Sequence, residues 1–141
     1  MLKLELVTLD GTKFSEEVHE VVLPTPQGYI AVFTDHAPLV SLAVSGVITV
    51  RRKSGDPDSR LEHFATHGGV IEIANNSVRV LVDEADREDE INEQEAQKAL
   101  DEAKKLAREA RDTVSLEQAQ ALVDRQATRL RVAELRRRKR R

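Results

Sequence analysis

Apolar and polar residues alternate over most of the first 82 positions. Residues 2–6 read Leu-Lys-Leu-Glu-Leu, which is the period-2 pattern of a strand that buries one face. Turn signals rich in Gly, Pro, Asn and Asp follow at intervals of about 8–12 residues, as is typical of an all-β sandwich or barrel. The strand-like runs cover residues 2–6, 18–23, 29–33, 39–43, 47–50, 60–66, 70–73 and 78–82.

The pattern changes to steps of three and four beyond position 90. Residues 91–141 contain no Gly and no Pro and are rich in strong helix formers. Asn92 can cap a first helix, and residues 112–115 interrupt the pattern, so we expect two helices. Ser115, with Gln118 three residues later, matches the capping box expected at the second helix start. The expected apolar stripes are Ala96, Ala99, Leu100, Ala103, Leu106, Ala107 and Ala110 in the first helix, and Leu116, Ala119, Val123, Ala127, Leu130 and Ala133 in the second.

Together these patterns predict an α+β chain, with an N-terminal all-β sandwich followed by a C-terminal antiparallel α-helical hairpin. We place the sandwich domain at residues 1–84, an acidic linker at 85–90 and the hairpin at 91–141. Both stripes are mostly alanine, and burying one alanine methyl contributes under ~1 kcal/mol, against roughly 1.5–3 kcal/mol for Leu or Val. We therefore expect a weakly held hairpin. A permanently packed hairpin and one that leaves its docked position both fit this pattern.

Charge is divided unevenly along the second half of the chain. The net charge is −3, but acids dominate residues 83–102 and bases dominate residues 125–141, which end in six basic residues. Such a division more often marks faces that meet partners, or each other, than a nucleic-acid-binding fold. With one Tyr, three Phe and no Trp, the chain has few rings to stack on bases, so we predict no nucleic-acid partner.

The chain has no Cys, no secretory signal at its start and no apolar run of the roughly 20 residues that span a bilayer. These features fit a reducing compartment. They also predict that any membrane association is through a partner.

No group of residues matches a catalytic or metal site. His63 and His67 can share a strand face, but they lack the dense ligand cluster of a metal centre. Gly68–Gly69 lacks the Lys and the spacing of a phosphate-binding loop. A nucleophilic triad would need a strand–turn–helix context that is missing here; its members would be Asp35, His36 and Ser41. We therefore expect no catalytic activity of its own, no cofactor and no metal.

Four segments resemble the epsilon subunit of F-type, proton-translocating ATP synthases. They are residues 33–40 (Phe-Thr-Asp-His-Ala-Pro-Leu-Val), 45–48 (Ser-Gly-Val-Ile), 68–73 (Gly-Gly-Val-Ile-Glu-Ile) and 130–135 (Leu-Arg-Val-Ala-Glu-Leu). The likeness covers essentially the whole chain, in order, with the same division into a β part and a helical hairpin. The His-Ala-Pro-Leu loop and the Gly-Gly motif together are fairly specific, whereas either alone is weak.

The resemblance implies a ten-stranded β-sandwich that clamps the gamma subunit and rests on the ring of c subunits, so that together they form the central stalk of the rotor. It also implies a hairpin that folds against the sandwich or extends along gamma and inhibits ATP hydrolysis. The residues it nominates for contact with the c-ring are Gln27, Gly28, Tyr29, His36, Ala37, Pro38 and Leu39. Those it nominates for the inhibitory contact with the acidic surface of the catalytic beta subunit are Arg125, Arg129 and Arg131. Ordinary packing of Pro38 and Leu39, and a solvated arginine face, are the alternatives.

Two segments depart from the family pattern. Many members begin the first helix with an Ile/Leu-Asp-x-x-Arg-Ala motif that binds ATP, whereas Asn92 and Glu95 stand here in place of its Asp and Arg. An anion in place of a phosphate-facing cation repels a polyanionic nucleotide at short range, so we predict weak or absent ATP binding. The family turn Gly-Glu/Asp-Leu/Ile-Gly-Ile reads Gly-Tyr-Ile-Ala-Val at 28–32, so the ring contact is expected to be less acidic.

We therefore predict a non-catalytic rotor subunit of a proton-transporting ATP synthase, which couples gamma to the c-ring and regulates ATP hydrolysis. Its expected location is the cytoplasmic face of a bacterial plasma membrane, as a peripheral protein, with an organellar membrane as the second reading. The alternative is a free-standing sandwich whose basic hairpin recognises an acidic protein or nucleic acid. The basic end, 136–141, either reinforces inhibition or folds back onto the acidic segment. The sequence leaves open whether the hairpin is folded or extended.

Overall fold

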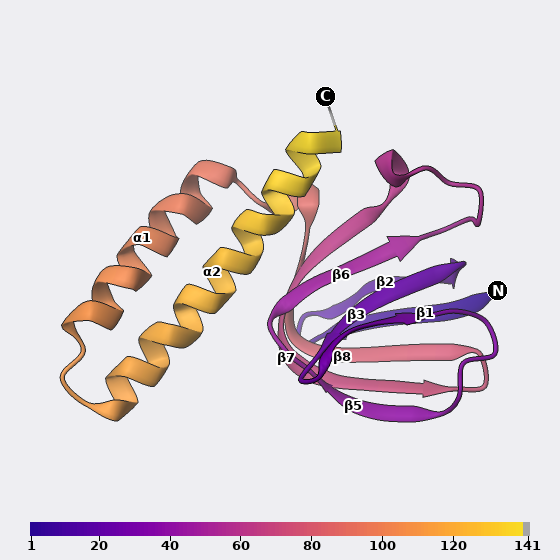
Figure 1. The fold of residues 1–141 in the computed structure, drawn as a ribbon, viewed down its shortest axis with the longest axis horizontal. Coiled ribbons are helices and arrows are strands. Elements are labelled where there is room, and N and C mark those ends of the chain that lie inside the picture. Colours follow the sequence, from indigo (N-terminus) through magenta and orange to yellow (C-terminus); the bar gives the residue numbers. More distant parts are fainter. Residues whose placement is uncertain (140–141) are drawn as a thin grey trace.

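Eight strands and two long helices make up residues 1–139, the part of the chain that this computed structural model describes (Figure 1). The strands are β1 (Leu2–Thr8), β2 (Gly11–Val18), β3 (Glu20–Thr25), β4 (Gly28–Val32), β5 (Leu39–Ala43), β6 (Gly46–Arg51), β7 (Glu62–Ala74) and β8 (Ser77–Arg87). The helices are α1 (Glu93–Glu109) and α2 (Thr113–Lys139), with short 3₁₀ helices η1 (Asp58–Arg60) and η2 (Glu88–Glu90). The predicted fold class, a β-sandwich followed by a helical hairpin, is confirmed.

Strand β7 pairs with different neighbours along its length. Its first half pairs antiparallel with β6, and its second half pairs antiparallel with β5. Strand β8 follows β7 throughout and also pairs in parallel with β1, so the order is β2-β1-β8-β7-β6-β3-β4 with β5 on the second half of β7. The expected count of ten strands is wrong, because the described residues form eight. The two longest strands run on unbroken, and β7 passes through Gly68–Gly69 without ending.

Gly69 lies at the point where β7 changes partner. A Cβ atom built there would lie 2.1 Å from the backbone oxygen of Leu81 in β8, and the residue has φ +153°. Gly68 has φ +64°, which is also a conformation that side chains with a Cβ rarely adopt. The Gly-Gly pair, where the sequence pattern predicts the end of a strand, is therefore the point at which the backbone of β7 packs closely on β8 and changes direction.

The sandwich core follows the predicted alternation. Leu2, Leu4 and Leu6 are fully buried, and the rings of Phe14 and Phe64 meet edge to face with centroids 5.9 Å apart. The rest of this core is mainly branched aliphatic residues: Val18, Val21, Leu23, Val32, Ile48, Val50, Ile71, Ile73, Val78, Val80 and Val82. Since each such side chain contributes roughly 1.5–3 kcal/mol when fully buried, most of the hydrophobic stabilisation of the fold lies in the sandwich.

Side-chain caps mark the starts of both helices. Asn92 caps α1, its Oδ1 accepting the Glu95 backbone N–H at 3.0 Å, which satisfies a donor of the first turn. Asp112, not Ser115, holds the start of α2, its Oδ1 accepting the Ser115 N–H at 2.7 Å. The predicted cap is therefore shifted by three residues, because a carboxylate there accepts from both the backbone and the hydroxyl of Ser115. Among the described residues, no helix is both long and apolar enough to cross a membrane.

The predicted linker is more structured than its composition indicates. Strand β8 continues to Arg87, and η2 fills the next three positions. The guanidinium of Arg87 lies over the Phe64 ring, 5.4 Å from its centroid, and donates to the Lys13 backbone oxygen at 2.6 Å. These contacts extend the strand beyond Val82. The division into two domains stays a prediction.

Candidate functional site: the docked hairpin

Helix α2 lies against the outward face of β6 and β7, with α1 packed on its far side (Figure 1). We call this outward face, with the adjoining part of β8, the docking face; its residues are Val47, Thr49, His63, Ala65, His67, Glu84 and Asp86. Val47 and Ala65 form a small apolar cluster with Val132 and Ala133 of α2. The hairpin therefore has a core of its own, separate from that of the sandwich.

This second core is small and lies at one end of the hairpin. Besides those four residues it contains only Ile91 and Ala96 as buried members, with Leu130 and Leu135 at its edge. Val132, which the predicted stripe omitted, is fully buried, whereas Leu106 and Leu116 of the predicted stripes are exposed. Because half of the buried members are alanines, the cluster holds the hairpin by only a few kcal/mol of apolar burial.

A row of ion pairs joins α2 to the acidic end of β8 and to η2. Arg125 Nη2 lies 2.6 Å from Glu84 Oε1, and Arg129 Nε lies 3.2 Å from Asp86 Oδ2. Further along the helix, Lys139 Nζ lies 2.6 Å from Glu88 Oε1. Bases near the C-terminus thus meet the acidic segment 83–90, so the two charged regions of the sequence face each other.

The three arginines nominated by the sequence do not share one environment. Arg125 and Arg129 pair with acids of β8, whereas the side chain of Arg131 is 52% exposed and lies 4.0 Å from Glu134 of the same helix. The positive charge of Arg131 also helps to lower the pKa of His63. Six residues along an α-helix turn the side chain by about 600°, which places Arg131 about 120° away from Arg125. The predicted basic end covers residues 136–141, and its last two residues, Arg140 and Arg141, lie outside the described residues.

His63 lies under the last turns of α2. The residue is 7% exposed, and its Nδ1 is 3.1 Å from the Thr49 hydroxyl. Burial lowers the pKa of His63; the negative charge of Glu88 opposes this shift, and the positive charge of Lys139 adds to it. A polar cavity of about 270 Å³ opens beside the ring, lined by Glu62, His63, Phe64, Arg87, Glu88, Asp89 and Arg136.

The start of α1 shows what replaces the family's nucleotide motif. The side-chain oxygen of Asn92 is used by the helix cap. Glu95 is exposed, and Glu93 forms an ion pair with Arg137 of α2 at 2.9 Å. An open cavity of about 440 Å³ lies between these segments, lined by Ile91, Asn92, Glu93, Gln94, Ala133, Arg136 and Arg137. Its lining carries one acid, Glu93, and two arginines, and the ion pair engages Arg137 but not Arg136. Glu93 therefore lies where a phosphate chain would have to approach these arginines.

The candidate ring contacts fall into two groups at the two ends of β4. Tyr29, beside Gln27 and Gly28 in the β3–β4 turn, has an exposed ring whose hydroxyl accepts the Val47 N–H at 3.0 Å. The loop 36–39, with Ala37 and Pro38 exposed and Leu39 partly so, follows the far end of β4. Asp35 anchors this loop to the β7–β8 turn, its backbone N–H donating to Asn76 Oδ1 at 2.5 Å. The structure therefore does not bring the two groups together.

An exposed apolar strip lies between these two groups and was missed in the sequence. Its members on and near β5 are Val40, Leu42 and Val44, which are 74%, 62% and 36% exposed. Residues 39–44 are apolar at five of six positions, in both phases of the strand. A strand that is apolar on both faces but lies at the edge of a sheet carries one uncovered apolar face, and this signal was available.

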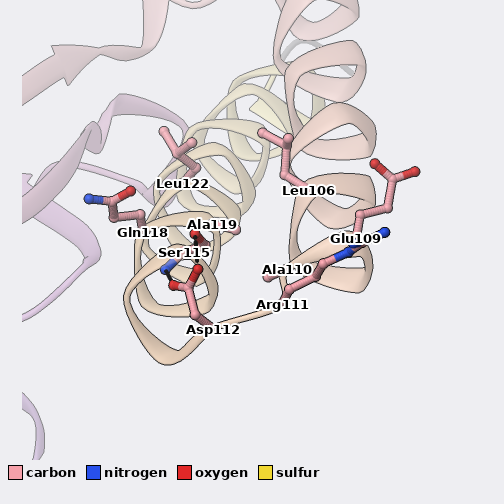
Figure 2. Close-up of a pocket in the computed structure, with 9 residues that line it drawn as sticks. All are labelled: Leu106, Glu109, Ala110, Arg111, Asp112, Ser115, Gln118, Ala119 and Leu122. Carbon is pink, nitrogen blue, oxygen red and sulfur yellow. Dashed lines mark hydrogen bonds between the residues drawn. The ribbon is translucent and has the colours of Figure 1, made fainter.

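The turn end of the hairpin projects away from the sandwich (Figure 1) and holds an open groove between the helices. Figure 2 shows Leu106 of α1 and Leu122 of α2 above the turn, with Asp112 bonded to Ser115 at its base. Hydrogen bonds from the Ser115 backbone N–H and hydroxyl lower the pKa of Asp112. The remaining lining residues are Glu109, Ala110, Arg111, Gln118 and Ala119. Its charges alternate in sign, which favours no particular ligand.

His36, Ser41 and His67, which include two residues of the hypothetical triad, each have a hydrogen-bonding partner. His67 Nδ1 lies 2.6 Å from the Ser45 hydroxyl, and His36 Nδ1 lies 2.6 Å from the Ala37 backbone oxygen. The Ser41 hydroxyl donates to the Leu42 backbone oxygen at 3.0 Å. Each side chain is therefore used in turn or strand contacts, and within residues 1–139 no cluster of three or more His, Cys, Asp and Glu has metal-binding geometry.

Comparison with known proteins gives consistent results. The family model described as "ATP synthase, Delta/Epsilon chain, beta-sandwich domain" matches residues 1–88. The ATP synthase epsilon chain of Moorella thermoacetica is 33% identical over 132 residues, which is 94% of this chain and 96% of the relative. That of Herpetosiphon aurantiacus is 34% identical over 137 residues, or 96% of each chain.

A similar fold occurs in a solved assembly. One chain in the cryo-EM structure of the Euglena gracilis mitochondrial ATP synthase, OSCP/F1/c-ring, superposes with a TM-score of 0.80 at 21% identity, over 94% of this chain and 81% of that one. At this identity the likeness concerns the fold.

Proposed function

Because the chain belongs to the epsilon-chain family of ATP synthases, we propose that it is a non-catalytic subunit of the rotor's central stalk. In this role the sandwich joins the gamma subunit to the ring of c subunits, and the hairpin limits ATP hydrolysis. The regulatory part of this proposal is supported by the way that apolar contacts are divided between the sandwich and the hairpin. A large core holds the sandwich, whereas six buried residues and a row of ion pairs hold the hairpin.

The coupling role rests on the apolar strip along β5. Val40 and Leu42 expose large apolar side chains next to each other on an edge strand, and such patches on a soluble chain usually bind a protein partner. The strip runs from the β3–β4 turn region to the loop 36–39. We propose that gamma covers the strip and that the c-ring meets the nominated residues at the sandwich surface.

The inhibitory role rests on the hairpin being a two-state element. Each ion pair of the row is partly exposed, and exposed pairs contribute only about 0.2–1 kcal/mol each. The docked state is therefore close enough in free energy to an undocked state for a partner to shift the balance. Undocking frees Arg125 and Arg129 for the acidic surface of the catalytic beta subunit.

Location and ligands follow from this assignment. We propose a peripheral position at the cytoplasmic face of a bacterial plasma membrane, reached only through the complex, with catalysis on other subunits. We also propose that the isolated chain has no nucleotide site, since Glu93 and Glu95 stand at the start of α1 where the family motif carries a cation.

Two experiments test the proposal. The chain is expected to co-purify stoichiometrically with gamma and the c-ring, and V40S/L42S is expected to lose this while L116S/L122S, at the hairpin tip, keeps it. A free-standing binding module would not co-purify with gamma.

For the regulatory half, ATP hydrolysis by the assembled enzyme is compared between the full chain and a chain ending at Asp112. Hydrolysis should rise on truncation, and an equal rate at both low and high salt would remove the inhibitory role.

A further inference from the structure

We propose that Tyr29 is a positioning residue that couples the β3–β4 turn to the docking of the hairpin. Its hydroxyl holds the start of β6, and the side chain of Val47 at that start belongs to the small cluster on which the hairpin packs. Contact at the turn and docking of the hairpin therefore favour each other. The identity of the partner at the turn as the c-ring rests on the proposed function. The link itself rests only on contacts within this chain.

Tyr29 supplies a hydrogen-bond acceptor where the ladder between β3 and β6 stops. That ladder ends at Val22 and Thr49, and the same register continued by two residues would bring Pro24 opposite Val47. The Pro24 carbonyl instead accepts the Val44 N–H at 3.2 Å. Because a backbone N–H that is shielded from water needs an acceptor, the Tyr29 hydroxyl takes this role for Val47 at 3.0 Å.

Close packing places the phenol over the first residue of β6. A Cβ atom on Gly46 would lie 2.8 Å from the Tyr29 hydroxyl oxygen and 2.6 Å from Cβ of Pro24. Tyr29 is the neighbour of Pro24 in the β3–β4 pairing, so its side chain crosses β3 to reach β6. This contact requires that position 46 has no side chain. A phenol that turns away from Gly46 leaves the Val47 N–H without this acceptor.

Val47 joins the two sites through a single residue. Its N–H meets Tyr29, and its side chain is buried in the cluster with Ala65 of β7 and with Val132 and Ala133 of α2. The cluster has few members, so a displacement of one of them changes a large part of the apolar contact that holds the hairpin. The position of the start of β6 therefore biases a two-state element, which is the physical requirement for coupling between distant sites.

The outer end of the link is accessible to a partner. Tyr29 is 58% exposed although its hydroxyl is bonded, so a partner that packs on the turn meets the phenol directly. A partner that covers it excludes the water that competes for the hydroxyl, and this strengthens the hydrogen bond and with it the docked state. No charged residue occurs between Glu20 and Asp35, so the turn fits an uncharged loop of the partner.

Removing one hydroxyl tests the link in the isolated chain. Y29F keeps the aromatic side chain but loses the acceptor. The methyl groups of Val132, which are fully buried in the cluster while the hairpin is docked, report the docked fraction by NMR. Y29F should raise the ratio of undocked to docked chain about twofold to fivefold, the factor that corresponds to part or all of one net hydrogen bond. It should also speed the amide exchange of Val47.

T25V is the matched control for this experiment. It removes a hydroxyl that donates to the Gly28 carbonyl at 2.6 Å in the same turn, in a hydrogen bond that does not involve β6. Both variants should lower the free energy of unfolding in urea, but only Y29F should alter the Val132 signals. Equal effects of the two variants on docking, or no effect of Y29F, would overturn the link.

Reciprocity supplies a second readout, because coupling acts in both directions. The chain has one Tyr and no Trp, so its tyrosine fluorescence comes from Tyr29 alone. V132A removes two methyl groups from the cluster and should change this fluorescence, whereas L116A, at an exposed position of the same helix, should not. Identical fluorescence of V132A and the wild-type chain would contradict the coupling.

The identity of the partner is tested in the assembled enzyme, with methyl labels in this chain only. Assembly with gamma and the c-ring should shift the wild-type chain toward docking by about twofold to fivefold more than it shifts Y29F. A shift of equal size in both would overturn the c-ring as the partner of the turn. Failure of the chain to assemble with the c-ring would contradict the proposed function instead, and the link would then be decided by the isolated chain.

Discussion

Nη1 of Arg137 lies 2.9 Å from Oε1 of Glu93, so the last described turns of α2 are joined to the first turn of α1. The pair closes the open end of the hairpin next to the apolar cluster that holds it on the sandwich. It also places opposite charges together where the family motif would hold a polyanion. This arrangement determines the first prediction.

ATP at millimolar concentration should not bind the isolated chain. Glu93 and Glu95 repel the phosphates, and Arg137 is engaged by Glu93. An NMR titration should therefore show no saturable shifts at residues 91–96. N92D/E95R, which restores the family pattern, should gain measurable affinity, and N92D alone, which adds a negative charge and leaves Glu95 in place, should not. Saturable shifts in the wild-type chain would contradict the prediction.

Acid should weaken docking in a window set by His63. Burial lowers the pKa of this imidazole, whereas an exposed imidazole titrates near 6.5. Below that pH the undocked chain takes up a proton that the docked chain does not, so docking is at full strength above about pH 6.5 and declines as the pH falls further. The chain has no Cys, so spin labels at E17C and A121C, both exposed positions, report one distance between sandwich and hairpin. They should show more undocked chain at pH 5.5 than at 7.5.

The control for this pH effect is H63Q, which should remove the dependence between pH 7.5 and 5.5. The charged groups around the ring are Glu62, Arg87, Glu88, Asp89, Arg131, Arg136 and Lys139. Partial burial raises the pKa of Glu90, but hydrogen bonds from the Arg87 backbone and the Lys13 side chain more than offset this effect and lower that pKa, so this carboxylate does not cause a change between pH 5.5 and 7.5. An unchanged pH dependence of docking in H63Q would mean that a group other than His63 causes the effect.

Truncating Val132 should loosen the hairpin without affecting the sandwich. Its side chain is fully buried in the small cluster, and V132A should cost the docked state about 2 kcal/mol, by analogy with other large-to-small core changes. The undocked fraction should rise while the melting of the strands, followed by circular dichroism, stays the same. L116A, at an exposed position of the same helix, is the matched control. A parallel loss of strand stability in V132A would mean that the two cores unfold as one.

A side chain at position 69 should destabilise the sandwich itself. A Cβ atom would lie 2.1 Å from the Leu81 backbone oxygen, so G69A requires two paired strands to separate. We expect a loss of about 3 kcal/mol in the free energy of unfolding, measured in urea. G55A, where nothing lies within 4 Å, should be nearly neutral. A neutral G69A would mean that β7 crosses between the layers without this close approach.

The sequence was most informative where periodicity is local. Alternation at residues 2–6 predicts a buried face that the structure contains, and the missing Gly and Pro after position 90 predict the helices. Local patterns failed where distant residues decide. The pattern predicts that a strand ends at Gly68–Gly69, because glycine weakens strands. Instead, close packing of Gly69 against β8 lets β7 continue through the pair and change its partner there. Strand β8 continues to Arg87, past the end of its apolar alternation at Val82, because Arg87 stacks on Phe64.

The sequence indicates which charged segments belong to the site, but not which residues pair with each other. The basic residues of α2 and the acids after Val82 stand out by composition, but Glu84 and Arg125 are 41 positions apart, and charge alone does not indicate which acid meets which base. The resemblance grouped Arg131 with Arg125 and Arg129, although helical geometry already separates it from them. The c-ring and inhibitory assignments stay predictions.

Strand β7 gives the sandwich a mechanical property. It is covalently continuous from its pairing with β6 to its pairing with β5, so a load applied at the exposed strip of β5 passes into the opposite layer along one backbone. Side-chain packing between the layers need not transmit that force. A sliding motion of one layer over the other would have to break the ladder of β7 on both sides of Gly69. The sandwich is therefore stiff in shear, and the hairpin can leave without removing any strand from it.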